Sequence, residues 1–241
     1  MARATGFTQV VEAVTPPRHA VRGYARWVAE SLTPTADVLN IGAGSNLSGA
    51  LLPVRRNTAH LVGVDPSPNI WDNQYLDERH QLSLEQFAAD HEAEFDVALS
   101  VFVLEHVSDP VAFTAACARV LRPGGLLFAL TVNKYQYFGL TTWATTRLGL
   151  NERLLRHLKG EQVVNSYHFP TEYRMNSPRQ CAQRLREAGF ASVQFRMFDK
   201  PDLYAWYLPD KLKPLAPAWS HLTYRLGTPA LMGSLSFRAV R

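Results

Sequence analysis

The chain contains a short apolar run that ends in two closely spaced glycines, Val38-Leu-Asn-Ile-Gly-Ala-Gly44. A glycine has no Cβ and tolerates positive φ, so this spacing lets the backbone pass close to a ligand at the end of a strand. A second apolar run, residues 60–64, ends in Asp65. Because parallel strands end at the same crevice, the Asp65 carboxylate is expected beside the glycine loop, where it would meet ribose hydroxyls. The pattern predicts an α/β fold with a nucleoside-binding site.

Two other classes of nucleotide site are disfavoured by residues that the sequence lacks. The dinucleotide fingerprint needs a third glycine to pack helix against strand, and Leu47 occupies that position here. The Gly-Lys-Ser/Thr of a phosphate-binding loop is also absent. A phosphate-free nucleoside with a charged sulfur, S-adenosylmethionine, needs only the close backbone approach and the ribose carboxylate. This cofactor is therefore expected, with a nicotinamide-dependent oxidoreductase as a competing hypothesis.

Length and composition predict one domain over residues 1–241. A chain with 46% apolar residues can bury one substantial core. Cys117 and Cys181 both follow helix-like sequence and are expected to be buried thiols. The first residues lack the apolar segment of a signal peptide, and no run approaches the ~18 apolar residues of a membrane span. The sequence therefore predicts a cytoplasmic protein.

Charge is distributed unevenly along the chain. Residues 1–134 carry 10 Lys+Arg and 14 Asp+Glu, whereas residues 135–241 carry 15 and 7, so that a net charge of +4 conceals a basic C-terminal part. Such an imbalance bears on association with anionic partners rather than on the fold. A basic surface that is simply solvated is the alternative.

Hydrophobic periodicity outlines the elements. Helices are expected at 18–31, at 104–120 and from Ser177-Pro178 to Gly189, with a turn at 122–125. Strands are expected at 37–41, 60–64, 95–101, 125–132 and 191–199, with a less distinct one near 79–84 and a half-buried antiparallel one at 231–240. The core thus covers about 35–132 and 177–199 plus 231–240. Residues 133–176 and 200–230 fit no element of this plan and are expected to form a substrate cover, the second of them extended because of its prolines.

Five motifs in order give the chain a family resemblance: Val38-Leu-Asn-Ile-Gly-Ala-Gly44, Leu61-Val-Gly-Val-Asp65, Phe95-Asp-Val-Ala-Leu-Ser100, Val103-Leu-Glu-His-Val107 and Val120-Leu-Arg-Pro-Gly-Gly125. Together they resemble the class I S-adenosylmethionine-dependent methyltransferases, the broad group that includes ubiquinone- and menaquinone-pathway enzymes. The resemblance implies a Rossmann-like, seven-stranded and mostly parallel sheet with an antiparallel last strand and helices on both faces. It also implies S-adenosyl-L-methionine as the cofactor.

The resemblance carries over a set of expected cofactor-binding residues. They are Asn40, Gly42, Gly44, Asn46, Asp65, Pro66, Ser83 and Ser100. Two of them depart from the family pattern, because Asn40 replaces an acidic residue and Asn46 replaces the third glycine of the first motif. The region of the adenine signal reads Leu82-Ser83-Leu84, so Ser83 and its neighbouring backbone are the expected adenine contacts.

Glu105-His106 is open to three interpretations. In ubiquinone O-methyltransferases a similar Glu-x-x-Glu-His stretch is associated with a divalent metal, but Phe102 stands in place of the first glutamate. One histidine and one carboxylate cannot hold a catalytic cation alone, so no metal is predicted. His106 is the candidate general base, which would take a proton from an acceptor oxygen. The alternative is a strand-to-helix corner in which Glu105 makes local contacts.

The residues expected to contact an acceptor come from the 133–176 insertion. They are Asn133, Tyr135, Tyr137, His168 and Tyr173. Glu172 and Arg174 are further polar candidates in the stretch Tyr167-His-Phe-Pro-Thr-Glu-Tyr-Arg174. For all of them, packing of the cover onto the sheet is the alternative role.

Residues 136–150 mix aromatic residues and leucines with one arginine and are followed by the basic residues Arg153, Arg156, His157 and Lys159, and residues 203–232 place aromatic residues among basic ones. This composition suits a peripheral contact with an anionic membrane or a lid over a lipid-like acceptor. Nucleic acid is the less favoured partner. The Asn/Asp-Pro-Pro-Tyr/Phe signature of base-amino methyltransferases is absent after residue 99, where Ser100-Val-Phe-Val stands, which leaves an RNA methyltransferase as an alternative.

The leading hypothesis is a bacterial-type methyltransferase that acts on a small-molecule, sugar or lipid-linked acceptor, most readily at oxygen. Methyl transfer depends mainly on aligning acceptor, methyl carbon and sulfur, so a dedicated base is optional. A non-catalytic S-adenosylmethionine- or nucleoside-binding module is the alternative. The sequence leaves the oligomeric state open.

Overall fold

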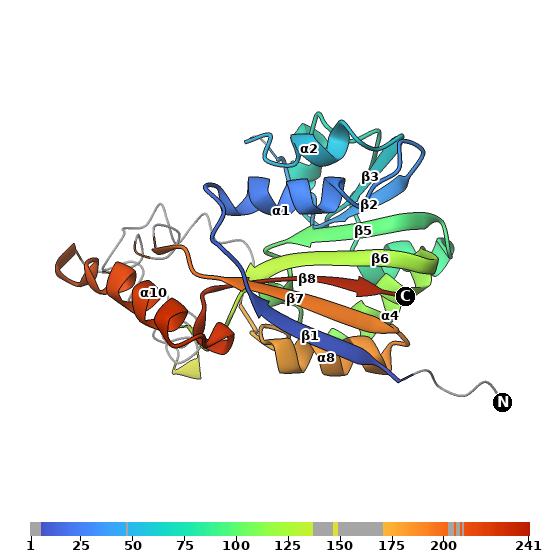
Figure 1. Cartoon of the computed structure of the whole chain (residues 1–241). Coiled ribbons are helices and arrows are strands. Elements are labelled where there is room, and N and C mark those ends of the chain that lie inside the picture. The colour runs from blue at the N-terminus through green and yellow to red at the C-terminus, as the bar shows by residue number, and fades with distance from the viewer. Residues whose placement is uncertain are drawn as a thin grey trace.

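A computed structural model describes residues 6–46, 48–136, 147–148, 171–201, 205, 208 and 210–241. Its strands form one eight-stranded sheet in the order β1-β7-β8-β6-β5-β2-β3-β4 (Figure 1). The strands are β1 Thr8–Ala13, β2 Asp37–Ile41, β3 His60–Val64, β4 Glu78–His80, β5 Phe95–Val101, β6 Leu121–Val132, β7 Ser192–Phe198 and β8 Ser234–Val240.

Helices cover both faces of this sheet. Two apolar clusters mark the two layers: one joins the sheet to α1 and α2, and the other joins it to α3, α4 and α8. The helices are α1 Ala20–Ala29, α2 Leu52–Arg55, α3 Leu84–Asp90, α4 Pro110–Val120, α8 Pro178–Glu187 and α10 Leu215–Arg225. Short 3-10 turns are η1 Pro68–Asp72, η2 Leu104–His106, η3 Asp210–Leu212 and η4 Pro229–Leu231.

The last strand lies inside the sheet. β8 pairs antiparallel with both β6 and β7, which confirms the predicted antiparallel strand. Both of its faces are covered, so Ser234 and Ser236 are buried together with Leu235 and Phe237. The prediction of a half-buried strand was therefore wrong for residues 234–237, where both faces are covered, whereas Arg238 and Val240 are partly exposed.

An eighth strand was not predicted. β1 pairs parallel with the outer edge of β7, from Thr8 opposite Ser192 to Ala13 opposite Met197. Five of its six residues are exposed, so it joins the sheet mainly through backbone hydrogen bonds. Such a strand leaves little trace in the hydrophobic pattern, which explains the expected count of seven.

The helix expected at 104–120 is divided into two pieces. η2 ends at His106, and α4 begins at Pro110. A residue before proline is disfavoured in the helical region, and Asp109 is instead extended, where its Oδ1 accepts hydrogen bonds from the amides of Val111 and Ala112, both at 3.0 Å. Because of this interruption His106 ends η2, outside α4, and lies at the edge of the sheet where the cavity opens.

Two smaller differences concern β4 and β6. The strand near 79–84 ends at His80, and Ser83 begins α3 in a capping box with Gln86. The turn at 122–125 is an excursion within β6, since the partner of Phe95 is Leu121 but that of Val97 is Leu126. Local hydrogen bonds at the helix cap and in the strand pairing set these boundaries, and the hydrophobic pattern of the sequence does not show them.

The 200–230 segment is partly helical. The expectation of an extended cover was wrong for residues 215–225, which form α10, although Pro214 stands at its N-cap and Pro217 lies in its first turn. Proline is tolerated there because the first amides of a helix have no intrahelical partner. Among the helices described here, none combines the length and the apolar character needed to cross a membrane.

Candidate cofactor and acceptor site

A cavity of about 400 Å³ opens where β2, β3 and β5 reach their carboxyl ends. Parallel α/β sheets bind ligands at this edge. The lining combines the end of each strand with the start of α3 and the corner after β5: Ile41, Gly42, Val64, Asp65, Pro66, Leu82, Ser83, Leu84, Glu85, Val101, Phe102, Val103, His106, Val107, Ser108 and Phe113. Four of the predicted cofactor residues line this cavity, Gly42, Asp65, Pro66 and Ser83, and so does His106.

Two glycines shape the loop that leaves β2. Gly42 has a φ of 66°, and a Cβ added to it would lie 2.3 Å from Cγ2 of Val103. Gly44 has a φ of 46°, and a Cβ there would meet nothing within 4 Å. Gly42 is thus needed by the fold itself, whereas the space beside Gly44 is open, and Gly44 is not among the residues of the cavity wall.

Asp65 supports this loop with its carboxylate. Oδ2 accepts a hydrogen bond of 2.9 Å from the amide of Gly44, and Oδ1 accepts one of 2.7 Å from the amide of Ser67. From the other side, Asn73 Nδ2 donates to the carbonyls of Ala43 and Gly44. A carboxylate has about four acceptor positions, so two remain for hydroxyl groups in the cavity.

The opposite wall is built by the residues before α3. Ser83 lines the cavity, but its hydroxyl accepts from the amide of Gln86 at 3.3 Å as the helix cap. Glu85, in the first turn of α3, brings a carboxylate to the same wall. Sequence reasoning missed Glu85. The capping box that starts at Ser83 could have revealed it, because that box fixes which residues form the first turn.

The corner after β5 forms the third wall. Phe102 has a φ of 56°, which a non-glycine residue adopts at a cost of order 1–3 kcal/mol. Its amide donates to the carbonyl of Leu130 at 2.8 Å, and the amide of His106 donates to the carbonyl of Val103 at 2.9 Å. These bonds hold the corner in a tight turn that brings Val103 against Gly42 and His106 to the cavity.

Glu105 faces the interior next to His106. It is 6% exposed, and its Oε2 accepts a hydrogen bond of 2.7 Å from the hydroxyl of Thr131. Asn176 Nδ2 donates in turn to Thr131 Oγ1 at 2.8 Å and to the carbonyl of Val132 at 3.0 Å. Burial raises the pKa of the Glu105 carboxyl, although the Thr131 hydrogen bond works against this shift. The chain of bonds joins η2, β6 and the residues before α8.

This position of Glu105 bears on the expected absence of a metal. Its carboxylate is engaged with Thr131, and Phe102 offers no oxygen. Among the residues that the structure describes, no group of three His, Cys, Asp or Glu side chains is arranged to hold a metal ion. Oxygen ligands in such number are what Mg²⁺ requires. Among the described residues, this corner therefore offers fewer metal ligands than the longer Glu-x-x-Glu-His stretch.

Residues 171–176 are fastened to the same corner. The amides of Glu172 and Tyr173 both donate to the backbone carbonyl of Glu105, at 2.7 and 3.2 Å. Arg174 pairs with Glu172 and donates to the carbonyl of Ser108 at 3.0 Å. Tyr173 is 5% exposed and has a φ of 51°. This arrangement agrees with the packing alternative for Glu172, Tyr173 and Arg174.

Several predicted site residues are not brought to the cavity. Asn40 and Ser100 are buried within β2 and β5, where the Ser100 carbonyl accepts from the Tyr24 hydroxyl at 3.1 Å. Asn133 is fully buried and donates to the carbonyls of Ala230 and Met232. Asn46, in the loop after β2 with a φ of 44°, is not among the residues of the cavity wall. Asn40, Ser100 and Asn133 thus lie outside the cavity wall, and their roles as direct contacts stay predictions.

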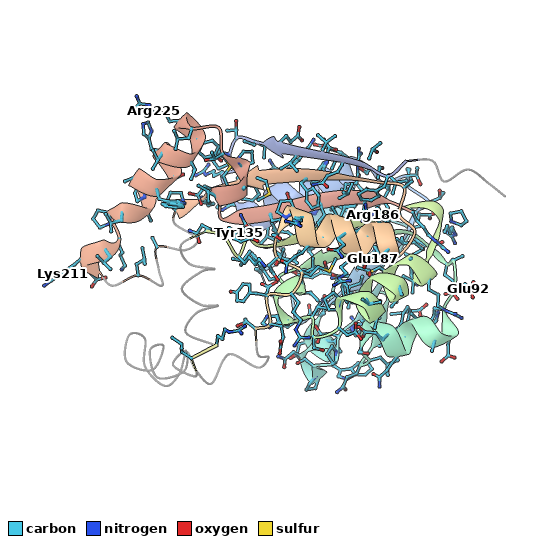
Figure 2. The ribbon with its side chains drawn as sticks, turned by 90° about the horizontal axis from the view of Figure 1, so that it is seen from below. Glu92, Tyr135, Arg186, Glu187, Lys211 and Arg225 are labelled. Atoms are coloured by element: carbon cyan, nitrogen blue, oxygen red, sulfur yellow. The ribbon has the colours of Figure 1, made fainter. Side chains whose placement is uncertain are left out.

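The remaining acceptor candidates fall into two groups. Tyr135 is 43% exposed, and Lys134 Nζ lies 5.1 Å from the centre of its ring, within cation–π range. Tyr135 follows the end of β6 and is labelled in Figure 2. Tyr137 and His168 lie outside the described residues.

Cys117 and Cys181 are free and buried, as expected, and neither belongs to the site.

Solved structures of similar fold cover nearly all of the chain. An S-adenosylmethionine-dependent methyltransferase from Archaeoglobus fulgidus aligns over 93% of this chain and 95% of its own, with 14% identity and a TM-score of 0.56. The [4+2]-cyclase SpnF aligns over 92% of this chain and 82% of its own, with 18% identity and a TM-score of 0.57. At these identities the likeness shows the fold alone.

Curated relatives add sequence similarity. A ubiquinone biosynthesis O-methyltransferase from Cereibacter sphaeroides is 38% identical over 184 residues, which are 72% of this chain and 68% of that protein. Its counterpart from Aromatoleum aromaticum is 35% identical over 105 residues, 40% of this chain and 44% of that protein. The latter alignment spans less than half of the relative.

A family model also matches most of the chain. Residues 17–194 fit the model described as a methyltransferase domain, and this span contains the glycine loop, Asp65 and the corner after β5. S-adenosylmethionine is the cofactor of that family, and the cradle at Gly44 and the free acceptor positions of Asp65 fit it. The chain belongs to the class I S-adenosylmethionine-dependent methyltransferases.

Proposed function

We propose that the protein transfers a methyl group from S-adenosylmethionine to a hydroxyl oxygen of a small-molecule or lipid-linked acceptor. The observation that supports this most is the meeting of Gly42, Asp65 and His106 around one cavity at the carboxyl edge of the sheet. A nucleoside would place its ribose hydroxyls at Asp65, and Glu85 would accept a hydrogen bond from an adenine amino group. The relatives named as ubiquinone O-methyltransferases support oxygen as the acceptor atom.

The cofactor, when bound, supplies an electrophilic methyl group. The residues of this chain then have two tasks, to align the acceptor oxygen and to receive its proton. The bound cofactor would supply the methyl group and retain the electron pair of the broken carbon–sulfur bond, and a ring nitrogen of His106 would accept the proton of the acceptor hydroxyl. Alignment contributes most of the rate, and a positioned base adds about 10²–10⁴-fold.

The first test is calorimetric titration with S-adenosylmethionine and S-adenosylhomocysteine. We expect both to bind. The second step measures S-adenosylhomocysteine formation with hydroxyl acceptors, with His106→Gln as the variant. This variant is expected to bind the cofactor within a few-fold of the native protein. Its turnover is expected to fall by the factor given above for a positioned base. Unchanged turnover would remove His106 from the mechanism.

A non-catalytic binding module is the second candidate, and one structural neighbour, described as a [4+2]-cyclase, shows that this fold serves other reactions. The candidates differ in product. Binding of S-adenosylmethionine without release of S-adenosylhomocysteine across a panel of phenols, sugars and lipid-linked hydroxyls would favour the binding module. The absence of binding would contradict both.

A further inference from the structure

Helix α10 and its flanks present a row of leucines to solvent. Leu212, Leu215, Leu222 and Leu226 are 44%, 59%, 47% and 59% exposed. The spacings of seven and four place the last three on one stripe of the helix. Another face of the same helix is buried through Ala216, Ser220 and Thr223. The helix is thus attached to the protein through small residues and through the part-buried Trp219 and Tyr224, whose side chains donate to the carbonyls of Leu231 and Val14, and it directs its leucines outward.

The surroundings of this leucine stripe are positively charged. Asp210 is the last acidic residue, and residues 211–241 contain no Asp or Glu. Lys213 forms an ion pair of 2.6 Å with Asp210, whereas Lys211, His221 and Arg225 are exposed. Figure 2 shows Lys211 and Arg225 at opposite ends of α10, both directed away from the sheet. Cations therefore flank the stripe at both ends.

The position of α10 relates this surface to the catalytic edge. It lies between β7 and β8 in the chain and extends beyond the end of the sheet at which β7 finishes (Figure 1). β7 runs in the same direction as β2, β3 and β5, because β8 is antiparallel to both β6 and β7. The leucine stripe and the cavity thus belong to the same edge of the molecule.

We propose that α10 is a docking surface for an anionic lipid bilayer. Exposed leucines flanked by Lys and Arg match the interface between acyl chains and anionic headgroups. A second copy of the chain fits less well, because two such helices would bring Lys211 and Arg225 of both copies together, and Asp210, the carboxylate described beside the stripe, already pairs with Lys213. If the proposed methyl transfer also holds, this surface would favour lipid-linked acceptors that are reached from the membrane.

Vesicle co-sedimentation of the full chain tests this docking. The native protein is expected to sediment with vesicles that contain phosphatidylglycerol, to sediment less at high salt, and to remain in solution with phosphatidylcholine alone. The variant Leu215→Ser/Leu222→Ser/Leu226→Ser is expected to lose most of the bound fraction. Val111→Ser is the apolar control, since Val111 is 55% exposed on α4, on a different part of the molecule.

Charge variants supply a second measurement. Lys211→Gln/Arg225→Gln is expected to lower the bound fraction several-fold at low salt. Arg179→Gln/Arg186→Gln removes the same charge from the exposed side of α8 and is expected to leave binding unchanged; Arg186 is labelled in Figure 2. Equal losses in both variants would show a non-specific charge effect and overturn the docking assignment.

Three further outcomes bear on the docking of α10 to a bilayer. Absence of sedimentation, or undiminished sedimentation of the serine variant, would overturn the proposal. A concentration-dependent dimer that the serine variant abolishes would assign the stripe to a second copy instead. S-adenosylhomocysteine titration of each variant keeps the two proposals separate, because the cofactor cavity does not include α10 and affinity should not change.

Discussion

Asp65 acts both as a wall of the cavity and as the support of the loop beside it. Asp65→Ala would remove the acceptors for the Gly44 and Ser67 amides, so it would lower stability as well as cofactor affinity. Asp65→Asn keeps the shape and one carbonyl acceptor, and it is therefore the sharper variant. We expect it to weaken S-adenosylhomocysteine binding by about 10–100-fold, the usual worth of a hydrogen bond to a charged group.

Calorimetric titration and a thermal melt of both variants check this expectation. Asp72→Asn, an exposed aspartate in η1, is the matched control. A melting temperature lowered by Asp65→Ala, together with unchanged affinity in Asp65→Asn, would mean that the carboxylate holds the loop and does not contact ribose.

Glu105 offers a prediction about stability and pH. Because burial raises its pKa above 4.5, the folded protein holds this proton more tightly than the unfolded chain. Its contribution to stability is present at pH below the ordinary value and is lost as the pH rises through the raised one. Glu105→Gln keeps an oxygen that accepts from the Thr131 hydroxyl and carries no ionisable group. The loss of stability that accompanies ionisation of Glu105 at neutral pH should therefore be absent in this variant. Glu105→Ala should cost about 2–4 kcal/mol through a cavity and an unpaired hydroxyl.

Urea unfolding at neutral and at mildly acidic pH measures both variants. The Gln variant is expected to match or exceed the native protein at neutral pH, and its advantage should shrink on acidification. An Ala variant as stable as the native protein would show that the Asn176–Thr131–Glu105 connection contributes nothing to the fold.

At these single positions the sequence was informative where backbone chemistry demands one residue type. Gly42 and Asp65 lie in the cavity wall, and the sequence pointed to them because a strand end that approaches a ligand needs a glycine and a carboxylate. Asn40 and Ser100 are absent from that wall because each lies one residue inside its strand, whereas Ile41 and Val101 line the cavity. Asn133 binds carbonyls almost 100 residues away, and no local pattern contains that information.

Among the elements, the start of α4 shows how a cap fixes a boundary. Asp109 accepts hydrogen bonds from two amides, so Asp109→Ala should destabilise the protein by about 1 kcal/mol. Ser83→Ala at α3 is a matched cap variant whose single bond is longer, 3.3 Å, and a smaller loss is expected there. Denaturant unfolding compares the two; an equal or reversed order would contradict the role given to Asp109.

Elements with a strong apolar period were predicted well, and those formed by other forces were not. The strands at 37–41, 60–64 and 95–101 and the helix after Ser177 appear within a residue or two of their expected bounds. β1 was missed because it is held by its backbone, and α10 because its apolar side chains face outward while Ala216, Ser220 and Thr223 face inward. Both depart from the rule that the apolar face marks the core.

At the scale of the whole molecule, one ion-pair group joins three strands at the edge opposite the cavity. Arg122 of β6 pairs with Asp37 of β2 at 2.9 Å and with Asp96 of β5 at 2.7 Å. Partial burial acts to raise the pKa of Asp96, but hydrogen bonds from Arg122 and the Asp37 amide outweigh it, and the pKa is lowered. The stabilisation is therefore present above the ordinary value of 3.8 and is lost as the pH falls through the lowered one.

Arg122→Gln should consequently shift acid unfolding to higher pH and change neutral stability by less than about 1 kcal/mol, since these groups are partly exposed. Circular dichroism during acid titration records the shift. Arg119→Gln, which removes a surface pair with Glu92, is the control and should leave the acid midpoint in place. Identical titration curves for native and Arg122→Gln protein would contradict the role of the group.

The place of β8 also sets the order in which the molecule can be assembled during synthesis. The strands from β2 to β6 are complete once residue 132 has been translated, and they can pair with one another at once. β7 and β1 have no place beside β6 until residues 234–240 emerge from the ribosome and fill the gap between them. β1 and β7 therefore wait for the last strand, and a ribosome that stalls before residue 234 leaves the edges of β6 and β7 open to chaperones and to aggregation.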